Sequence, residues 1–355
     1  MKEKNILVIN PGSTSTKIAV FQEDQVIHEE TLRHSSEELA VYGTIFEQFD
    51  FRRQMIESAI QTAGLQLKDL DAVVGRGGLL KPITSGTYQV NDRMLEDLKV
   101  GVLGQHASNL GGVLAYEIAQ PLGKPSFIVD PVVVDEMEPL ARYTGIPGVE
   151  RRSIFHALNQ KAIARLAAKQ LNQPYEAVNL IVVHLGGGIT VGAHTEGRVI
   201  DVTNGLDGEG PMTPERSGAL PAREVIHLTA KLDPAVLNKQ IAGKGGLVAH
   251  LGTNDVREVI ARIDAGDDHA EEVLMAMAYQ VAKSVGAMAT VLEGKVDGIV
   301  VTGGIAYNDR FVSWIEQRTK FIAPVFVFPG EDELKALADG ALRVLHHMEE
   351  AKVYE

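Results

Sequence analysis

The 355-residue chain contains no cysteine, so disulfide bonds, thiolate catalysis and cysteine-ligated metals are excluded. It also lacks an apolar run long enough to span a bilayer, and no signal-peptide core precedes the first expected strand. Basic residues are outnumbered, with 34 Lys and Arg against 47 Asp and Glu and a formal net charge of −13. This acidity argues against nucleic acid or an anionic membrane surface as a partner. We therefore expect a cytoplasmic protein that binds neither.

Near the start of the chain, two apolar, β-branched runs flank a turn of small polar residues. This pattern predicts a strand–loop–strand hairpin over residues 6–21. Gly12 allows the backbone to approach a ligand closely, and the hydroxyl groups of residues 13–15 add hydrogen-bond donors. Lys17 adds a positive charge, so the loop suits a phosphate group. On this stretch alone, an ordinary Ser/Thr turn is the alternative.

A second Gly-rich hairpin, over residues 180–194, repeats the pattern half a chain later, and its turn is the glycine triplet 186–188. A third apolar run, 298–305, contains the glycine pair 303–304. Two hairpins in corresponding places indicate a duplicated fold that holds a nucleotide between its halves. Neither a Walker loop nor a Gly-x-Gly-x-x-Gly turn after a strand occurs in the chain.

Hydrophobic periodicity predicts helices over residues 36–49, 52–64 and 108–119, and a long helix that opens near Arg151. A polar loop from 204 to 221 is long enough to indicate a functional role. The final helix, expected over 332–350, should fold back to close the first half of the chain. At this length the chain should form two domains, each with its own core.

Asn10-x-Gly12-Ser13-Thr14-Ser15-x-Lys17 resembles the first signature of the acetate kinase/butyrate kinase family, within the actin/hexokinase/Hsp70 superfamily. His184-Leu185-Gly186-Gly187-Gly188-Ile189-Thr190 resembles its second signature, and scattered similarity extends over essentially the whole chain. The resemblance implies an α/β, two-lobed actin-like ATPase (duplicated ribonuclease H-like) fold with the active site in the interlobe cleft. The first lobe would be residues 1–150 plus 331–355, with the acyl and phosphate site. The second, 151–330, would bind the nucleotide and mediate dimerisation.

This resemblance implies a short-chain acyl kinase that uses ATP/ADP and Mg²⁺ to interconvert a carboxylate and an acyl phosphate, in a homodimer or larger homo-oligomer. Chain length and a Gly-rich acyl segment are more similar to the butyrate kinases, so butyrate or a branched C4–C5 acid is the expected substrate. An acetate or propionate kinase is one alternative. A sugar kinase would need an acid such as Asp130 to deprotonate a hydroxyl. A non-enzymatic ATP switch would leave Arg76 and Arg216 with no anion beyond ATP.

The family pattern carries over residue by residue. Arg76 matches the arginine that grips the acyl carboxylate, and Arg216 matches the one that neutralises the transition state. The full implied catalytic set is Arg76, His106, Asp130, His156 and Arg216. The implied phosphate and nucleotide ligands are Asn10, Ser13, Ser15, Lys17, His184, Gly186, Gly188, Asp255, Arg257, Gly303, Gly304 and Ile305. The implied metal ligands are Asn10, Asp130 and Glu333, although the run Glu331-Asp332-Glu333 leaves open which acid serves the metal.

Elementary chemistry supports one role independently of the family. A carboxylate nucleophile has a pKa of roughly 4–5, so it is already ionised at neutral pH and needs no general base. Asp130 is therefore better assigned as a metal or water ligand than as a base.

Some positions depart from the acetate kinase pattern, including Pro131 in place of a threonine and Tyr307 in place of a glutamate. Gly77 and Gly78 replace two valines that help to wall off a methyl-sized pocket, and Gln105 replaces an aliphatic residue. We expect these losses to open space for a longer acyl chain. The alternative is that Leu79, Leu80 or Phe155 refills that space and the glycines merely permit a tight turn.

Overall fold

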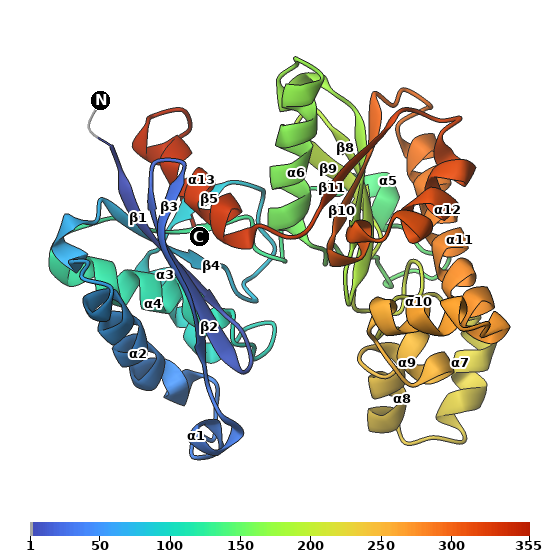
Figure 1. Cartoon of the computed structure of the whole chain (residues 1–355), viewed down its shortest axis with the longest axis horizontal. Coiled ribbons are helices and arrows are strands. Elements are labelled where there is room, and N and C mark those ends of the chain that lie inside the picture. Colours follow the sequence, from blue (N-terminus) through green and yellow to red (C-terminus); the bar gives the residue numbers. More distant parts are fainter. Residues whose placement is uncertain (1–2) are drawn as a thin grey trace. The chain divides into compact units, whose positions relative to one another are not determined.

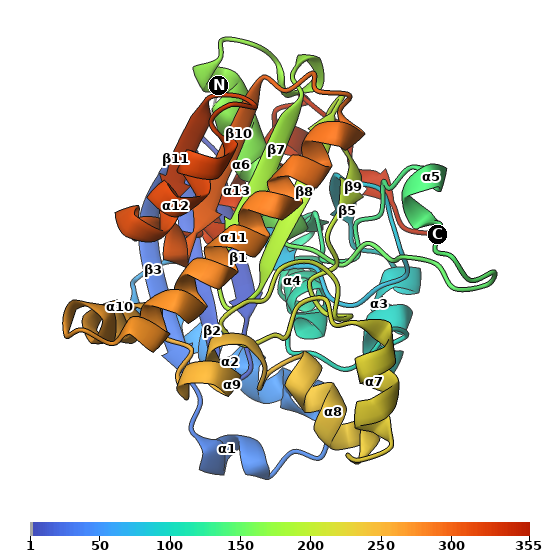
Figure 2. The same cartoon turned by 90° about the vertical axis from the view of Figure 1, so that its right-hand side faces the viewer.

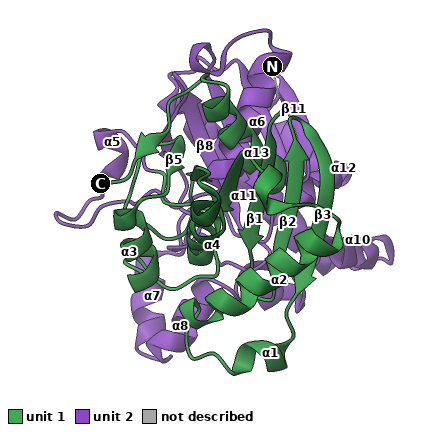
Figure 3. Ribbon diagram, turned by 90° about the vertical axis from the view of Figure 1, so that its left-hand side faces the viewer, with its two compact units in different colours: residues 1–134, 332–355 green, residues 135–331 purple. Residues whose placement is uncertain are grey.

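The computed structural model describes residues 3–355, which form two compact units (Figure 3). Unit 1 runs up to Val134 and includes Asp332–Glu355, and unit 2 is Asp135–Glu331. The division expected from sequence differs in assigning residues 135–150 to the first half. In the structure, Glu136 forms a 2.6 Å ion pair with Lys161 of unit 2. This pair ties the start of segment 135–150 to unit 2.

Unit 1 is built on a seven-stranded sheet. Its strands are β1 (Asn5–Pro11), β2 (Ser15–Gln22), β3 (Gln25–Arg33), β4 (Ala72–Arg76), β5 (Thr87–Gln89), β6 (Ser126–Val129) and β12 (Lys352–Val353). They lie in the order β12-β5-β6-β4-β1-β2-β3. Strands β1 to β3 form an antiparallel meander, while β4 is parallel to β1 and β6 is parallel to β4. The predicted hairpin over residues 6–21 is therefore the pair β1–β2.

Helices cover both faces of this sheet. They are α1 (Ser36–Ala40), α2 (Phe49–Thr62), α3 (Asp92–Val100), α4 (Asn109–Ala119) and α13 (Glu333–Leu345), with 3₁₀ turns at Phe46–Gln48, Leu67–Asp69 and Gln120–Leu122. Leu7 and Ile9 of β1 pack in one core with Ile56 of α2 and Leu114 of α4. Helix α13 comes from the far end of the sequence, yet it lies beside β1 (Figure 1). The last helix thus completes unit 1, as its position in the sequence predicts.

The contact between β4 and α4 requires glycine on both sides. A Cβ atom on Gly75 would lie 2.0 Å from the carbonyl oxygen of Gly111, and a Cβ on Gly111 would lie 2.2 Å from that of Arg76. A Cβ on Gly78 would lie 2.5 Å from the Cα of Asn109, at the first turn of α4. The backbone of α4 therefore rests directly on the end of β4 that carries Arg76.

Unit 2 repeats the strand order of unit 1. Its strands are β7 (Leu180–Leu185), β8 (Ile189–Thr195), β9 (Arg198–Val202), β10 (Gly298–Gly303) and β11 (Val325–Pro329), arranged as β11-β10-β7-β8-β9. Strands β7 to β9 form an antiparallel meander, β10 is parallel to β7, and β11 is parallel to β10. The same connections relate β1, β2, β3, β4 and β6, so the duplication expected from the two hairpins is present.

Unit 2 contains helices on both faces of its sheet and other helices that pack away from it. They are α5 (Pro139–Arg142), α6 (Ala157–Gln170), α7 (Ala222–Thr229), α8 (Pro234–Ile241), α9 (Gly246–Leu251), α10 (Val256–Asp264), α11 (Asp268–Val291) and α12 (Asp309–Thr319), with 3₁₀ turns at Tyr175–Ala177 and Gly304–Tyr307. Alanines of α6 share a core with Val182 and Val300, whereas α11 and α12 pack on the face that carries Val183 and Val301. Figure 2 shows α11 running across the sheet. Among the helices described over residues 3–355, none has both the length and the apolar character that a bilayer crossing requires.

Two helix predictions are wrong at their boundaries. The helix expected over 36–49 stops at Ala40, and an irregular stretch containing Gly43, a poor helix former, separates it from the next turn. The helix expected from Arg151 begins at Ala157 instead. The Arg151 guanidinium donates to the carboxylates of Asp201 and Glu209, which hold the chain before α6 in a non-helical conformation.

Replacing Gly75 by alanine should destabilise the protein, because the new methyl group would collide with the backbone of α4. Overpacking of this kind costs about 3 kcal/mol in the free energy of unfolding. As a control, Gly286 lies inside α11, and a Cβ there would meet no atom within 4 Å. Gly286→Ala should therefore stabilise the protein by about 0.5–1 kcal/mol through helix propensity. Urea denaturation of the two variants measures both effects; equal stability of Gly75→Ala and the parent would contradict the packing argument.

Candidate active site

Three predicted site residues meet in unit 1. Because Ile9 pairs with Gly75 in the parallel β1–β4 ladder, Asn10 and Arg76 come next to each other at the ends of these strands. The Asn10 amide nitrogen donates to Glu333 Oε2 at 2.7 Å, and Arg76 Nη1 lies 2.6 Å from the same oxygen. Arg76 Nη1 also donates to Asn10 Oδ1 at 3.4 Å. Strand register and the first residue of α13 together assemble this cluster.

The Arg76 guanidinium retains donor capacity in this cluster. Its bonds to Asn10 and Glu333 both use Nη1. Within residues 3–355, Nε and Nη2 of Arg76 donate to no acceptor, and 27% of the side chain remains exposed. A guanidinium edge with two parallel N–H groups matches the two oxygens of a carboxylate.

His106 lies near Arg76 and is oriented by the residue two positions later. Its Nδ1 lies 2.8 Å from the Ser108 hydroxyl and accepts a 3.2 Å hydrogen bond from the Ser108 amide. Desolvation of the ring, and then the charge of Arg76, lower the pKa of His106 below its ordinary value. The ring is therefore neutral at pH 7, with its proton on Nε2, because Nδ1 accepts from the Ser108 amide.

Asp130 is almost fully buried just beyond β6, with a positive φ of 39°. Its Oδ1 accepts hydrogen bonds from the Ser85 hydroxyl and the Gly86 amide, both at 2.7 Å. This carboxylate oxygen therefore secures the turn at residues 85–86. No three histidine, aspartate or glutamate side chains in the described part of the chain gather into a cluster that could hold a metal ion.

The first Gly-rich loop, residues 12–16, comprises the β1–β2 connection at 12–14 and the first two residues of β2. Ser13 is exposed, Ser15 is half-buried, and the exposed Lys17 is the cross-strand partner of Asn10. Cross-strand partners project from the same face of a sheet. The register therefore places Lys17 on the same face of the sheet as Asn10.

In unit 2, His156 and His184 stack with ring centroids 3.7 Å apart and an interplanar angle of 11°. His184 Nδ1 lies 2.7 Å from Asn159 Oδ1, and its Nε2 lies 3.2 Å from a carboxylate oxygen of Glu331. His156 Nδ1 lies 2.9 Å from the Thr190 hydroxyl. The two predicted histidines thus belong to one cluster beside the second Gly-rich turn.

Arg216 comes from the long polar loop and lies against that same turn. A Cβ on Gly188 would be 2.0 Å from Arg216 Nη1, so only glycine lets the guanidinium lie this close to the backbone. Nη1 donates to the carbonyl oxygen of Gly205 at 2.6 Å. Burial lowers the pKa of Arg216 below its usual value, and the neighbouring Glu215 partly offsets this effect. The residue remains a cation at neutral pH.

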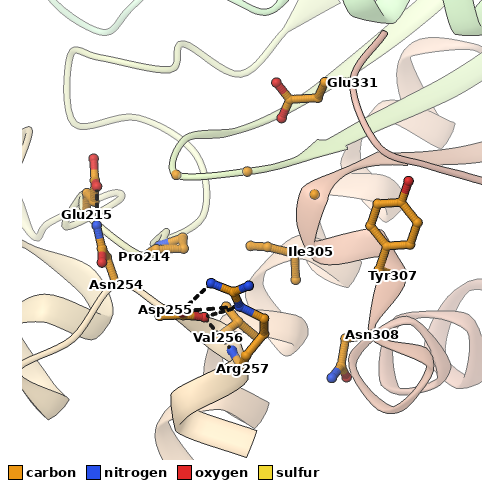
Figure 4. A pocket seen from close by; sticks show the side chains of 13 residues that line it. Pro214, Glu215, Asn254, Asp255, Val256, Arg257, Ile305, Tyr307, Asn308 and Glu331 are labelled. Atoms are coloured by element: carbon orange, nitrogen blue, oxygen red, sulfur yellow. Dashed lines mark hydrogen bonds and ion pairs between the residues drawn. The ribbon is translucent and has the colours of Figure 1, made fainter. Parts of the chain in front are cut away.

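A pocket of about 810 Å³ opens beside these residues, within the size range of nucleotide-binding sites. Of the predicted nucleotide ligands, Gly186, Asp255, Arg257, Gly304 and Ile305 line it (Figure 4). Arg257 donates from Nε to Asp255 Oδ1 at 2.9 Å and from Nη2 to Asp255 Oδ2 at 2.6 Å. The hydrogen bonds from Arg257 lower the pKa of Asp255 to about 2, so this pair is ionised at neutral pH.

Three further predicted nucleotide ligands of unit 2, His184, Gly188 and Gly303, do not line the pocket. His184 reaches it through Glu331, which is a lining residue, and Gly188 lies under Arg216. Gly303 has a φ of 94°, and its backbone rests against that of Leu185. A glycine is required there because a Cβ would lie 2.3 Å from the Leu185 carbonyl oxygen.

Other lining residues were not assigned from sequence as nucleotide ligands. They are Gly187, Pro214, Glu215, Asn254, Val256, Tyr307, Asn308 and Glu331. Two of them could have been found from their position in the sequence, because Glu215 precedes Arg216 and Asn254 precedes Asp255. In the structure Asn254 donates a 2.6 Å hydrogen bond to Glu215.

The three consecutive acids 331–333 have different contacts. Glu331 approaches His184, and the Asp332 side chain caps α13 by accepting from the Lys335 amide. Glu333 is the acid that contacts Asn10 and Arg76. One run of acidic residues thus supplies three separate local structures.

Two sheets with the same strand order, each with a Gly-rich hairpin at one end, define an actin-like ATPase-type fold, as expected. The acetokinase family model matches residues 142–321, just over half of the chain. The chain belongs to the acetokinase family. It is accordingly a carboxylate kinase, a phosphotransferase whose acceptor is a carboxyl group.

Solved structures share this fold over nearly the whole chain. Acetate kinase from Porphyromonas gingivalis has a TM-score of 0.80 at 22% identity, covering 96% of this chain and 100% of its own. Acetate kinase from Entamoeba histolytica has a TM-score of 0.80 at 16% identity, covering 97% and 100%. A propionate kinase from Francisella tularensis subsp. tularensis SCHU S4 has a TM-score of 0.76 at 20% identity, covering 95% and 98%.

Replacing Asp255 by asparagine should weaken nucleotide binding, because Arg257 loses the charged partner that holds its guanidinium at the pocket. We expect the Kd for ADP to rise about fivefold, as for loss of one charge-assisted hydrogen bond. Asp267→Asn is the matched control, since it removes a similar pair with Arg262 from residues that do not line the pocket. Calorimetric titration with ADP should find the control unchanged, and equal affinities in all three proteins would remove Asp255 from the nucleotide site.

Proposed function

We propose that this chain is a short-chain acyl kinase that transfers a phosphoryl group reversibly between ATP and butyrate or a branched C4–C5 acid, giving an acyl phosphate and ADP. The family establishes the reaction type. The identity of the acid, and the roles given below to individual residues, are the proposal.

The observation that carries the proposal is the donor edge of Arg76. Its Nε and Nη2 groups donate to no described residue, while Nη1 is fixed by Asn10 and Glu333. A planar fork held on one side and free on the other is suited to bidentate binding of a substrate carboxylate. In this proposal His106, neutral and protonated on Nε2, donates a further hydrogen bond to the acyl group.

Transfer itself requires positioning and positive charge rather than proton transfer. The substrate carboxylate is ionised at neutral pH, so no base is needed. We assign Arg216 and His156, which lie beside the second Gly-rich turn, to the phosphoryl group during transfer. In unit 1, the loop at Ser13 and Ser15 and the Lys17 ammonium are assigned to phosphate binding.

A sugar kinase would need an acid placed to remove a proton from a hydroxyl group. Asp130 is the candidate for that role, but its Oδ1 already accepts two hydrogen bonds at 2.7 Å from residues 85–86. This oxygen is already engaged in holding the turn at residues 85–86, so it is not placed to take a proton from a substrate hydroxyl. This favours the carboxylate kinase over the sugar kinase.

Mg²⁺ is the metal ion that the family implies, and the proposed ligands are Asn10, Asp130 and Glu333. These side chains offer hard oxygen donors, which suit Mg²⁺, and Asn10 and Glu333 are already in contact. The absence of a three-residue His/Asp/Glu cluster in residues 3–355 agrees with an ion held largely through water and phosphate oxygens. When bound, the ion would neutralise phosphate charge.

Gly77 and Gly78 do not widen the acyl pocket, contrary to the expectation from sequence. A Cβ on Gly77 would lie 2.6 Å from Pro131 Cβ, and a Cβ on Gly78 would lie 2.5 Å from the Cα of Asn109. The glycines are therefore required by close packing, and the volume that valine side chains would fill is already occupied. What still supports a C4–C5 acid is the similarity to butyrate kinases and the apolar ring of Pro131 beside Gly77, where acetate kinases carry a threonine.

A chain-length series tests the substrate. With ATP and hydroxylamine present, acyl phosphate formed from each acid is trapped as the hydroxamate. Each buried methylene contributes about 0.8 kcal/mol, or roughly fourfold in specificity. We therefore expect kcat/KM for butyrate or isobutyrate to exceed that for acetate by about tenfold, with propionate between them. Acetate as the best substrate would refute the butyrate assignment, and no hydroxamate from any acid would refute the acyl kinase itself.

Alanine substitution of Arg216 and of Arg76 should change different kinetic constants. Arg216→Ala should lower kcat by roughly 10³-fold with little change in the KM for the acid, because its proposed contact strengthens as charge develops during transfer. Arg76→Ala should raise the KM for the acid as well, because it removes the ground-state carboxylate partner. Arg198→Ala, at an exposed arginine paired with Glu196, is the control and should retain parental kinetics. A near-parental kcat in Arg216→Ala would exclude that residue from the mechanism.

A further inference from the structure

Arg52 of α2 is fully buried, yet no carboxylate among the described residues lies within salt-bridge distance of it. Its neighbour Arg53 pairs with Asp50 and Glu57 at the surface in the ordinary way. Burial lowers the pKa of Arg52 to about 10, so the side chain is still a cation at neutral pH. A buried cation without a carboxylate partner is costly unless other groups satisfy its hydrogen bonds.

The partners of Arg52 are the carbonyl groups of the first Gly-rich loop. Nη1 donates to the carbonyl oxygens of Gly12 at 2.9 Å and Ser15 at 3.1 Å, and Nη2 donates to that of Ser13 at 3.2 Å. Nε and Nη2 also donate to the Gln48 side chain, one helical turn away, at 3.1 and 2.9 Å. Gln48 thereby fixes the plane of the guanidinium.

The same geometry leaves the opposite side of the loop with donors. With three carbonyl groups turned inward to Arg52, the amide groups of exposed Ser13 and Thr14 donate to no described acceptor. The Gly12 amide closes the turn by donating to the Ser15 carbonyl at 2.7 Å. A run of outward N–H groups over a buried positive charge forms an anion-binding concavity.

A second layer lies beneath Arg52. Its Nη1 donates to the Thr16 hydroxyl at 3.0 Å, and that hydroxyl lies 2.9 Å from His34 Nε2. Burial, and then the charge of Arg52, lower the pKa of His34 to about 4. His34 is therefore neutral, so the positive charge of this buried layer is that of Arg52.

We propose that Arg52 is a positioning residue for phosphoryl binding: its guanidinium holds the carbonyl groups of residues 12, 13 and 15 inward, so that the amides of residues 13 and 14 and the adjacent hydroxyls face the phosphoryl group. Arg52 does not touch the substrate. It acts through the loop, and through the positive charge that it places beneath it. The inference rests on the proposed function for the identity of the phosphoryl compound, an acyl phosphate.

Two substitutions test this. Arg52→Gln removes the charge and most of the loop contacts, whereas Arg52→Lys keeps the charge but cannot reach all three carbonyl groups at once. Arg53→Gln, at the neighbouring arginine on the surface of α2, is the matched control. Circular dichroism and thermal melting establish that each variant is folded, and Arg52→Lys carries the test if Arg52→Gln is not.

Binding to the whole chain is measured with three probes: inorganic phosphate, butyryl phosphate and butyrate. In both Arg52 variants the Kd for phosphate and for butyryl phosphate should rise by about tenfold or more, while the Kd for butyrate stays within twofold. General destabilisation would not separate the phosphorylated from the unphosphorylated ligand. In the hydroxamate assay kcat should fall by about 10²-fold at an unchanged KM for butyrate.

Each other outcome overturns the inference. Parental phosphate affinity in Arg52→Gln would show that the loop keeps its form without the arginine. Parental affinity in Arg52→Lys would show that charge alone suffices, and absence of phosphate binding by the parent would show that the loop is no anion site. Failure of the proposed function looks different, because the parent would then bind phosphate in an Arg52-dependent manner and yet form no hydroxamate.

Discussion

Unit 1 depends on the close approach of α4 to β4. Gly75 and Gly111 allow the two backbones to touch, and this contact fixes the end of β4, of which Arg76 is the last residue. The loop that precedes α4 carries His106, so the same contact brings this ring near Arg76. Packing without side chains is rigid because there are no rotamers to adjust. The proposed carboxylate site therefore inherits its geometry from main-chain contact.

Although the chain is strongly acidic overall, two of the arginines with proposed roles contact carbonyl oxygens rather than carboxylates. Arg52 has carbonyl groups in place of a carboxylate, and Arg216 donates through Nη1 to a carbonyl oxygen. Carbonyl dipoles orient a guanidinium without cancelling its charge, whereas a carboxylate would do both. A phosphoryl-transfer site needs uncancelled positive charge, because the transferring group is an anion. Net charge is therefore a poor guide to the field at such a site.

The duplicated fold could be predicted from sequence, because glycine runs between apolar strands and matches to two signatures are local patterns. Five of the predicted nucleotide ligands also line one pocket. Contacts that depend on tertiary packing could not be predicted. From sequence, Gly77 and Gly78 suggest space left by absent side chains. In the structure Pro131 and the first turn of α4 occupy that space. Arg52 looks like one more charge on an amphipathic helix, and only the fold reveals that it points inward to a loop forty residues earlier.

Helix α13 combines two functions on one face. Glu333 meets Arg76, and Gly340 lies against Val129 of β6, where a Cβ would be 2.5 Å from a valine methyl. These positions are seven residues apart, close to two helical turns, so both project towards the sheet. Insertion or deletion of one residue between them would rotate one contact by about 100° relative to the other. The length of this segment is thus fixed by geometry.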